Sequence, residues 1–373
     1  MTKKLGFIVN PVAGIGGRVG LKGSDGPDIL RRALSLGAVP EAPRRARQAL
    51  IKLKTIENDL EVLTWSGAMG EEEALKAGFR PNVAGSALQT VSTPKDTENA
   101  ARRLAALGAD LLIFAGGDGT ARNIYQAVGN SLPVVGIPAG VKIHSAVYAT
   151  CPASAGLLAL TFLTGKGKPR LRDAEVMDID EDAFRKNRLS ARLYGYMKVP
   201  YDRVLIQGAK AGSRLNDDAA MDEIASDIIF NMTDEHLYIV GSGTTTQAVM
   251  NKLALPNTLL GIDAVYRKTL AGNDLSENSL LDLLKTRKGK ILVTVIGGQG
   301  HVFGRGNPQI SPRVIRRVGK ENIIIAATEA KILGLQGRPL LVDTGDPEMD
   351  DTLCGYTQVV VGLRKRLAYR IAI

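Results

Sequence analysis

Short apolar runs alternate with segments of helical periodicity along most of this chain. The apolar runs have the length of buried strands and lie at residues 5–9, 111–115, 134–137, 237–240, 259–265, 291–296, 323–326 and 340–342. Between them, apolar residues recur at helical spacing in the segments 97–107, 121–128, 217–231, 245–253 and 276–284. Such alternation favours parallel sheets with helices packed on their faces. The sequence therefore predicts the α/β fold class.

The length of the chain indicates two domains. Its 373 residues exceed what one hydrophobic core usually organises. A run of Gly, Lys and Pro at 164–169 is typical of a linker. We therefore expect an N-terminal α/β domain at 1–165, with a parallel sheet, and a C-terminal mixed α/β domain at 170–373. Antiparallel strands are expected at 174–179 and 189–199, and a return of the chain end to the first domain stays open.

Composition argues against several classes of protein. The net charge of +10 favours anionic partners, but aromatic residues make up only 5% and offer no obvious stacking surface for nucleic acid. Most basic clusters, including residues 44–47, fall in helical patterns and are interpreted as solvated faces. No apolar stretch reaches the ~18–20 residues that span a bilayer, and no signal peptide is evident. We expect a cytoplasmic protein that binds small nucleotides, and neither nucleic acid nor a membrane.

The most specific motif is a strand that ends in glycines around one aspartate. It reads Gly116-Gly117-Asp118-Gly119-Thr120, and a helical pattern follows it. Glycines let the backbone approach a ligand closely, and the start of a helix favours a phosphate group. An aspartate beside bound phosphates can take a proton from an attacking hydroxyl or help to hold magnesium. We interpret Asp118 as the catalytic residue and its four neighbours as phosphate-binding, because a plain helix cap needs only one glycine.

A second glycine-rich loop follows the first strand. It contains Asn10, Gly14 and Gly17 together with the cations Arg18 and Lys22. The glycine spacing resembles the dinucleotide-binding fingerprint of dehydrogenases. However, the next helical pattern is delayed, and no acidic residue closes a second strand at the expected distance. We therefore interpret this loop as a phosphate grip, with a plain surface loop as the alternative.

Other loops after predicted strands are candidate binding segments. Gly140 and Lys142 follow the strand at 134–137. Hydroxyl groups gather where the strand at 237–240 meets the next helix, which suits either a phosphate or an ordinary helix cap. These hydroxyl residues are Ser242, Thr244, Thr245 and Thr246.

The glycine-rich segment 297–307 is interpreted as a substrate-binding loop. It carries Arg305, which could neutralise a transferring phosphoryl group, His301, which could orient one, and Asn307. Asp263 is a further substrate-binding candidate. For a metal, Asp263 or Asp343 near strand ends could serve, because Mg²⁺ typically takes only one or two protein carboxylates. Two cysteines and three histidines argue against a disulfide framework or a His-rich metal site.

Together these motifs resemble a superfamily of kinases. An Asn-Pro-x-x-Gly loop after the first strand, followed later by a strand and Gly-Gly-Asp-Gly-Thr, is similar to NAD kinases, diacylglycerol-type lipid kinases and phosphofructokinases. The segments 136–145, 241–246 and 296–307 resemble the ATP-NAD kinase-like branch that includes the acetoin-catabolism X protein. The resemblance covers nearly the whole chain. It implies an N-terminal sheet of the Rossmann-like or phosphofructokinase-like kind.

The resemblance also implies an activity. In NAD kinases the aspartate of this motif, here Asp118, is the base toward the ribose 2′-hydroxyl of NAD. ATP and NAD would be the substrates, Mg²⁺ the cofactor and NADP the product, with polyphosphate as an alternative donor. Enzymes of this kind are usually symmetric oligomers, so we expect a dimer or a tetramer.

Some departures from the NAD kinase pattern keep other functions open. The Asn-Glu pair typical of NAD kinases is not evident after the Gly-Gly-Asp-Gly-Thr motif, and the second half alternates strands with helices where those enzymes are largely β. The Gly-Thr-Gly-Asn-Asp sequence of lipid kinases is absent at 136–145, which argues against a lipid acceptor. The alternatives are a kinase of another small hydroxyl metabolite and a non-catalytic NAD or nucleotide sensor.

Overall fold

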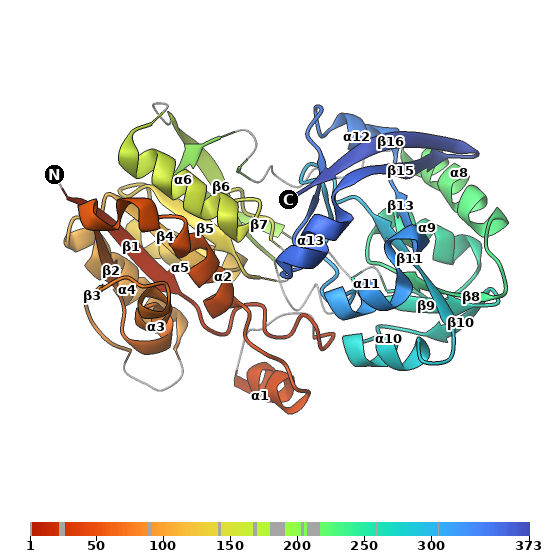
Figure 1. Ribbon diagram of the computed structural model, residues 1–373, viewed down its shortest axis with the longest axis horizontal. Helices are drawn as coiled ribbons and strands as arrows, with labels where there is room; N and C mark the ends of the chain where they lie inside the picture. The colour runs from red at the N-terminus through yellow and green to blue at the C-terminus, as the bar shows by residue number, and fades with distance from the viewer. Residues whose placement is uncertain are drawn as a thin grey trace.

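The computed structural model describes residues 2–21, 27–87, 92–140, 143–166, 170–179, 191–202, 205–206, 217–258, 260–304 and 306–373. They form two lobes that lie side by side, the N-terminal one on the left of Figure 1 and the C-terminal one on the right. A parallel sheet organises the first lobe and a mixed sheet the second. The predicted fold class is therefore confirmed, while the domain limits at 165 and 170 remain a prediction.

The N-terminal lobe is built on five parallel strands in the order β3-β2-β1-β4-β5. Its elements, in chain order, are β1 (Lys3–Val9), α1 (Pro27–Ser35), α2 (Ala42–Ile51), the 3₁₀ helix η1 (Lys54–Asp59), β2 (Leu60–Thr64), η2 (Gly67–Met69), α3 (Glu71–Lys76), β3 (Asn82–Val83), α4 (Pro94–Ala106), β4 (Leu111–Gly116), α5 (Asp118–Val128), β5 (Val134–Pro138) and α6 (Pro152–Thr164). Helices α2 and α6 cover one face of the sheet, and α4 and α5 cover the other (Figure 1).

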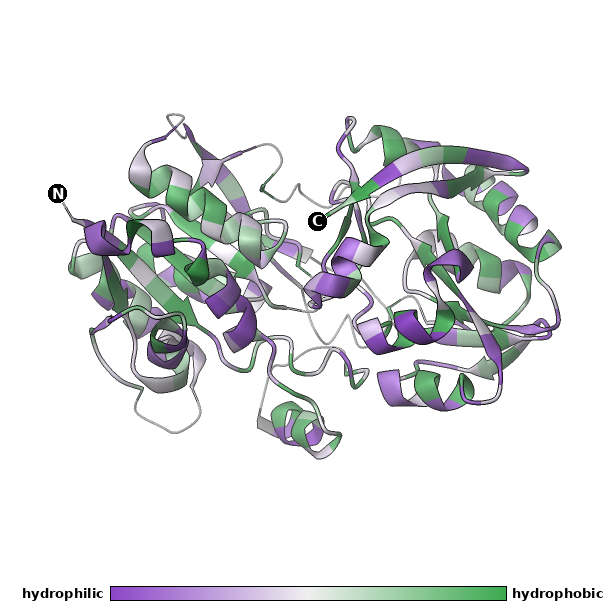
Figure 2. Ribbon diagram, in the orientation of Figure 1, coloured by the Kyte–Doolittle hydropathy of each residue, from purple (hydrophilic) through white to green (hydrophobic). Residues whose placement is uncertain are grey.

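The central strands of this sheet read as continuous apolar runs because helices cover both of their faces. Every residue from Leu111 to Ala115 in β4 is fully buried, as are Leu5 and Phe7 in β1. Figure 2 shows these strands in green, while purple residues gather on the outer sides of the helices. An antiparallel hairpin of β6 (Arg170–Ile179) and β7 (Ala191–Tyr201) packs against α5 and β5, as the sequence predicted for this region.

The C-terminal lobe contains a nine-stranded sheet in the order β10-β9-β8-β11-β13-β15-β16-β14-β12. Its elements are α8 (Asp217–Phe230), β8 (His236–Val240), α9 (Thr244–Lys252), β9 (Asp263–Tyr266), β10 (Thr269–Gly272), α10 (Glu277–Leu283), β11 (Lys288–Thr294), β12 (His301–Phe303), α11 (Pro312–Val318), η3 (Lys320–Asn322), β13 (Ile323–Ala326), α12 (Glu329–Leu333), β14 (Leu340–Val342), α13 (Pro347–Leu353), β15 (Gly355–Gly362) and β16 (Lys365–Ala372). Strands β8, β11, β13 and β15 are parallel neighbours, and β16 runs antiparallel to β15.

One predicted strand has the wrong start. The apolar run at 259–265 forms a strand only from Asp263, and Leu259 itself lies outside the described residues. The Asp263 carboxylate accepts hydrogen bonds from the Thr258 backbone N–H and hydroxyl, at 2.7 and 2.8 Å. These bonds hold Thr258 close to Asp263, and the backbone bends at Leu260 and Gly261, so the strand begins only at Asp263.

The last strand, β16, pairs with β14 and β15 and so lies within the nine-stranded sheet. No helix among the described residues is long and apolar enough to cross a membrane.

Candidate active site

The three strands β1, β4 and β5 lie side by side, and their carboxyl ends carry the predicted loops. From β1 the chain continues to β2 on one side, and from β4 it continues to β5 on the other side. Open α/β sheets bind ligands at such a point, between the two strands where the direction of the connections changes. A Cβ atom added to Gly14 would lie 2.0 Å from the Ala139 carbonyl oxygen, and Gly14 also has a φ of +72°. A Cβ atom added to Gly140 would lie 2.7 Å from the Gly117 Cα atom. Glycine therefore permits the close approach of the three loops.

A side-chain hydrogen bond joins the first two loops. The Asn10 amide donates from Nδ2 to the Thr120 hydroxyl oxygen at 3.0 Å, and Thr120 is 3% exposed. The Thr120 side chain fills the space over Gly116, where a Cβ atom would lie 2.4 Å from the Thr120 Cβ atom. Asn10, Gly116 and Thr120 therefore hold the shape of the site.

Asp118 is the first residue of α5 and is only 5% exposed. Its Oδ2 atom accepts a hydrogen bond from the His144 backbone N–H at 2.7 Å, and its Oδ1 atom accepts one from the Ser145 backbone N–H at 3.0 Å. The imidazole Nδ1 atom of His144 lies 3.3 Å from the same Oδ2 atom. Neither His144 nor Ser145 was predicted as a site residue, although both follow β5, the parallel neighbour of β4.

A cleft between the lobes begins at these loops. Both lobes contribute its lining residues, which are Gly14, Arg18, Glu41, Arg45, Ala139, Gly140, Gly304, Pro308, Ile310, Ser311, Asp343, Thr344 and Gly345. Of the candidates predicted from sequence, Gly14, Arg18, Gly140 and Asp343 are therefore brought together on one surface.

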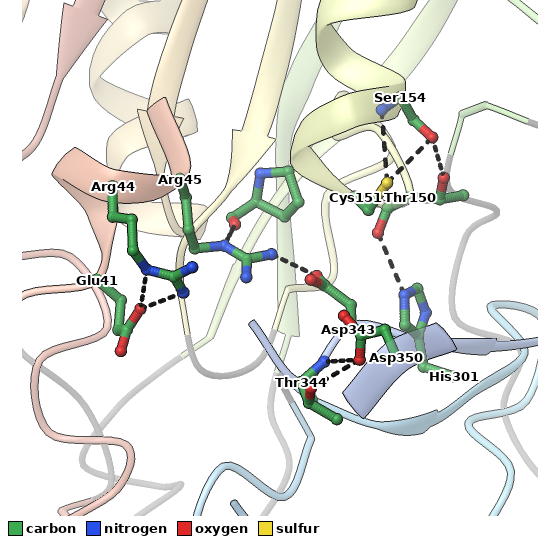
Figure 3. A network of polar contacts seen from close by, with 12 residues as sticks. Glu41, Arg44, Arg45, Thr150, Cys151, Ser154, His301, Asp343, Thr344 and Asp350 are labelled. Atoms are coloured by element: carbon green, nitrogen blue, oxygen red, sulfur yellow. Dashed lines mark hydrogen bonds and ion pairs between the residues drawn. The ribbon is translucent and has the colours of Figure 1, made fainter. Parts of the chain in front are cut away.

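Arg45 lines this cleft and joins the two lobes through its contact with Asp343, which Figure 3 shows. Its guanidinium donates hydrogen bonds to the Pro138 carbonyl and to the Asp343 carboxylate, and both charged residues are 5% exposed. Burial lowers the pKa of Arg45, but the Asp343 carboxylate outweighs this effect and raises the pKa above its ordinary value. The interpretation of residues 44–47 as a solvated face is therefore wrong for Arg45.

Arg18 stands at the rim of the cleft. Its guanidinium lies 3.2 Å from a Glu41 carboxylate oxygen, and Arg44 contacts the other oxygen at 2.6 Å. The Arg18 carbonyl oxygen accepts a hydrogen bond from the Glu277 backbone N–H at 3.2 Å, so the first loop also contacts the C-terminal lobe. Lys22, Lys142 and Arg305 lie outside the described residues.

The hydroxyl residues after β8 have varied surroundings. Ser242 donates to the Gly306 carbonyl at 2.9 Å and so contacts the loop that lines the cleft. Thr245 and Thr246 are buried, and the Thr245 hydroxyl accepts a hydrogen bond from the Lys331 ammonium at 2.8 Å. Thr244 is exposed at the start of α9.

Two further candidates of the C-terminal lobe, Asn307 in the loop after β12 and His301 at the start of β12, are buried and hydrogen-bonded. Asn307 donates to the Val302 carbonyl at 2.9 Å and accepts from the Gly304 backbone N–H at 3.0 Å, so it fixes the loop that lines the cleft. The His301 Nε2 atom lies 3.2 Å from the Thr150 carbonyl oxygen of the other lobe (Figure 3).

The described residues do not build a metal site on their own. Asp343 is paired with Arg45, and Asp263 accepts hydrogen bonds from Thr258 and from the Asp274 backbone N–H. Within the described ranges no group of three or more His, Cys, Asp and Glu side chains is placed to hold an ion. Mg²⁺ commonly binds through phosphate oxygens and water with one or two carboxylates, so a bound nucleotide would have to supply most of its ligands.

Two family models match the sequence. The ATP-NAD kinase N-terminal domain matches residues 5–166, and the ATP-NAD kinase C-terminal domain matches residues 233–371. Together they cover about four fifths of the chain, including all of the loops described above. No curated protein matches it.

Proposed function

The chain belongs to the ATP-NAD kinase family, and from this premise we propose that it transfers a phosphoryl group from ATP to the 2′-hydroxyl of NAD, giving NADP. The observation that carries the proposal is the position of Asp118. Its buried carboxylate lies at the first turn of α5, between glycine loops that meet at the carboxyl ends of β1, β4 and β5. A phosphoryl group and an acceptor hydroxyl can meet at such a place.

Different residues of the site would serve different steps of phosphoryl transfer. Backbone N–H groups of the glycine loops and the start of α5 would bind phosphate oxygens, and Arg18 at the rim would offset their charge. Magnesium, when bound with the nucleotide, would neutralise charge that develops on the phosphates. The acceptor hydroxyl must also lose its proton, and this step would depend on Asp118. Catalysis would thus come mainly from positioning and charge neutralisation.

The C-terminal lobe favours a second candidate function, phosphorylation of another small hydroxyl metabolite. Its nine-stranded sheet is covered by helices, whereas the resemblance implies a largely β domain in NAD kinases. This lobe supplies Gly304, Ile310 and Thr344 to the cleft, so a different architecture can present a different acceptor surface.

The proposal has four further parts. They are polyphosphate as an alternative donor, membership of the acetoin-catabolism X branch, a cytoplasmic location and a dimeric or tetrameric assembly.

The test is a turnover assay with purified protein, Mg²⁺, ATP and a panel of NAD, NADH and small polyols, with products identified by mass. Formation of NADP supports the proposal, and another phosphorylated product transfers it to the second candidate. Asp118→Asn separates a kinase from a sensor, because a kinase should lose turnover and retain affinity, while a sensor should keep both its ligand and its function. Tight NAD binding without any turnover by the unaltered protein would contradict the proposal.

A further inference from the structure

We propose that His144 is a second catalytic residue and that its Nε2 atom takes the proton of the acceptor hydroxyl, with Asp118 orienting the imidazole. This inference rests on the proposed kinase function. It assigns the proton to an atom that neither the family match nor the sequence pattern identifies.

The Asp118 carboxylate is already engaged on both of its oxygens. Two backbone N–H groups, those of His144 and Ser145, donate to it at 2.7 and 3.0 Å. Each oxygen thus already accepts one backbone hydrogen bond, which fixes the orientation of the carboxylate. The arrangement suits a carboxylate that holds a neighbouring group in place, as in catalytic pairs where an acidic group orients a base.

The neighbour that Asp118 holds is the His144 imidazole. Its Nδ1 atom lies 3.3 Å from Oδ2, and an ionised carboxylate can only accept a hydrogen bond. The proton of the neutral ring is therefore on Nδ1, which leaves a lone pair on Nε2. His144 is 6% exposed, and Nε2 is buried with no hydrogen-bond partner in the described part of the chain. The ring thus has one nitrogen fixed by Asp118 and one free to accept a proton.

The backbone around His144 is fixed from both lobes. The Gln299 side chain of the C-terminal lobe donates to the Ile143 carbonyl at 3.0 Å. The Ser145 hydroxyl donates to the Met177 carbonyl at 2.8 Å and accepts from the Met177 backbone N–H at 3.0 Å. The imidazole therefore lies in the loop after β5, where the two lobes meet beside the glycine loops. Fixed geometry of this kind is what a proton acceptor in phosphoryl transfer needs.

An unpaired acceptor in a buried place is costly when nothing binds to it. A ligand hydroxyl that donates to Nε2 removes this cost. In the reaction the hydroxyl proton passes to Nε2 as the oxygen forms its bond to the γ-phosphorus. The bond from that phosphorus to the β–γ bridging oxygen breaks, and the nucleoside diphosphate leaves with the electron pair. The Asp118 carboxylate stabilises the imidazolium, which later loses its proton to solvent.

The first test compares His144→Asn with His144→Gln in the acceptor-panel assay. The asparagine amide can occupy the place of Nδ1 and keep the contact with Asp118, but it has no atom at the position of Nε2. General-base catalysis contributes about 10²–10⁴-fold, so His144→Asn should lower kcat by that factor and leave the KM for ATP within about threefold. His144→Gln should be equally slow. His236→Asn is the matched control with full activity, because His236 begins β8 at its amino end and contacts Thr233 there.

A kcat within about tenfold of the unaltered protein in His144→Asn would overturn the proposal and leave Asp118 as the direct base. If the unaltered protein turns over no acceptor, the proposed function fails and the catalytic role of His144 fails with it. A second measurement tests the pair without turnover. The chain has three histidines, so ¹⁵N-histidine NMR can assign each ring by substitution. We expect His144 as the Nδ1–H tautomer, and as a tautomer mixture in Asp118→Asn. A proton on Nε2 in the unaltered protein would overturn the proposal.

Discussion

Removing the carboxylate of Asp343 should destabilise the protein strongly, because the buried Arg45 guanidinium loses its ion-pair partner and keeps its hydrogen bond to the Pro138 carbonyl. Both members of the pair are 5% exposed, so water cannot replace the lost partner. Breaking a buried ion pair in this way costs about 3–5 kcal/mol. The two residues are 298 positions apart and belong to different lobes, so this loss of stability should weaken the contact between the lobes.

A double-mutant cycle isolates the pair. We expect Asp343→Leu and Arg45→Met each to lower the free energy of unfolding by about 3–5 kcal/mol. The double variant should be about 2–3 kcal/mol more stable than the sum of the two single losses predicts, because it leaves no buried charge without a partner. Arg44→Met is the matched control on the same helix. Its pair with Glu41 is partly exposed, at 33% and 24%, so its loss should stay below about 1 kcal/mol.

Urea unfolding measures these differences for each lobe. The single tryptophan, Trp65, is buried in the N-terminal lobe, so its fluorescence reports that lobe while far-UV circular dichroism reports both. Two transitions that separate in the variants would show that the pair couples the lobes. The reasoning is refuted if Asp343→Leu costs no more than Arg44→Met, or if the double variant shows no recovery.

Further predictions concern the glycine loops, acid stability and the metal. In Gly140→Ala the added Cβ would lie 2.7 Å from the Gly117 Cα atom, so calorimetric ATP affinity should fall at least about tenfold; unchanged affinity would exclude phosphate binding between these loops. Burial opposes ionisation of Asp227, but hydrogen bonds from Arg366 and the Arg364 backbone N–H outweigh it and lower its pKa. The ionised Asp227 carboxylate therefore contributes to folding stability above the unfolded-state pKa of about 3.9, and this contribution is lost as the pH falls through the pKa of the folded protein. Asp227→Asn should cost about 1–3 kcal/mol at pH 7 and progressively less in acid, and a deficit independent of pH in urea unfolding would be inconsistent with this. EDTA should abolish turnover without changing the melting temperature, whereas a large drop in melting temperature would reveal a protein-built metal site.

The sequence was most informative where structure depends on neighbouring residues. The run from Leu111 to Ala115 and the glycines after it predicted both a buried strand and the glycine turn that leads into α5, because apolar length and backbone freedom are local properties. Helix α10 forms within the helical pattern at 276–284, and Ser276 precedes it and accepts a hydrogen bond from the Ser279 backbone N–H. Strand β2 was not predicted, because Glu61 interrupts its apolar run and partners on both sides stabilise it.

Contacts between distant segments escaped the sequence analysis. Arg45 looked like one cation of a solvated cluster, and only Asp343 from the other lobe accounts for its burial. His144 meets Asp118 only because β4 and β5 are adjacent, so no spacing along the chain indicated their contact. Asp263 looked like a ligand at a strand end, yet its carboxylate accepts hydrogen bonds from Thr258 and holds it close to the start of β9.

The most direct measurement follows the phosphoryl group itself. The protein is incubated with Mg²⁺, NAD and ATP whose γ-phosphoryl oxygens carry ¹⁸O, and the nucleotides are separated and examined by mass spectrometry. The proposed function predicts NADP that carries the labelled phosphoryl group on its 2′-oxygen. Label found only in inorganic phosphate, or retained entirely in ATP, would contradict the account.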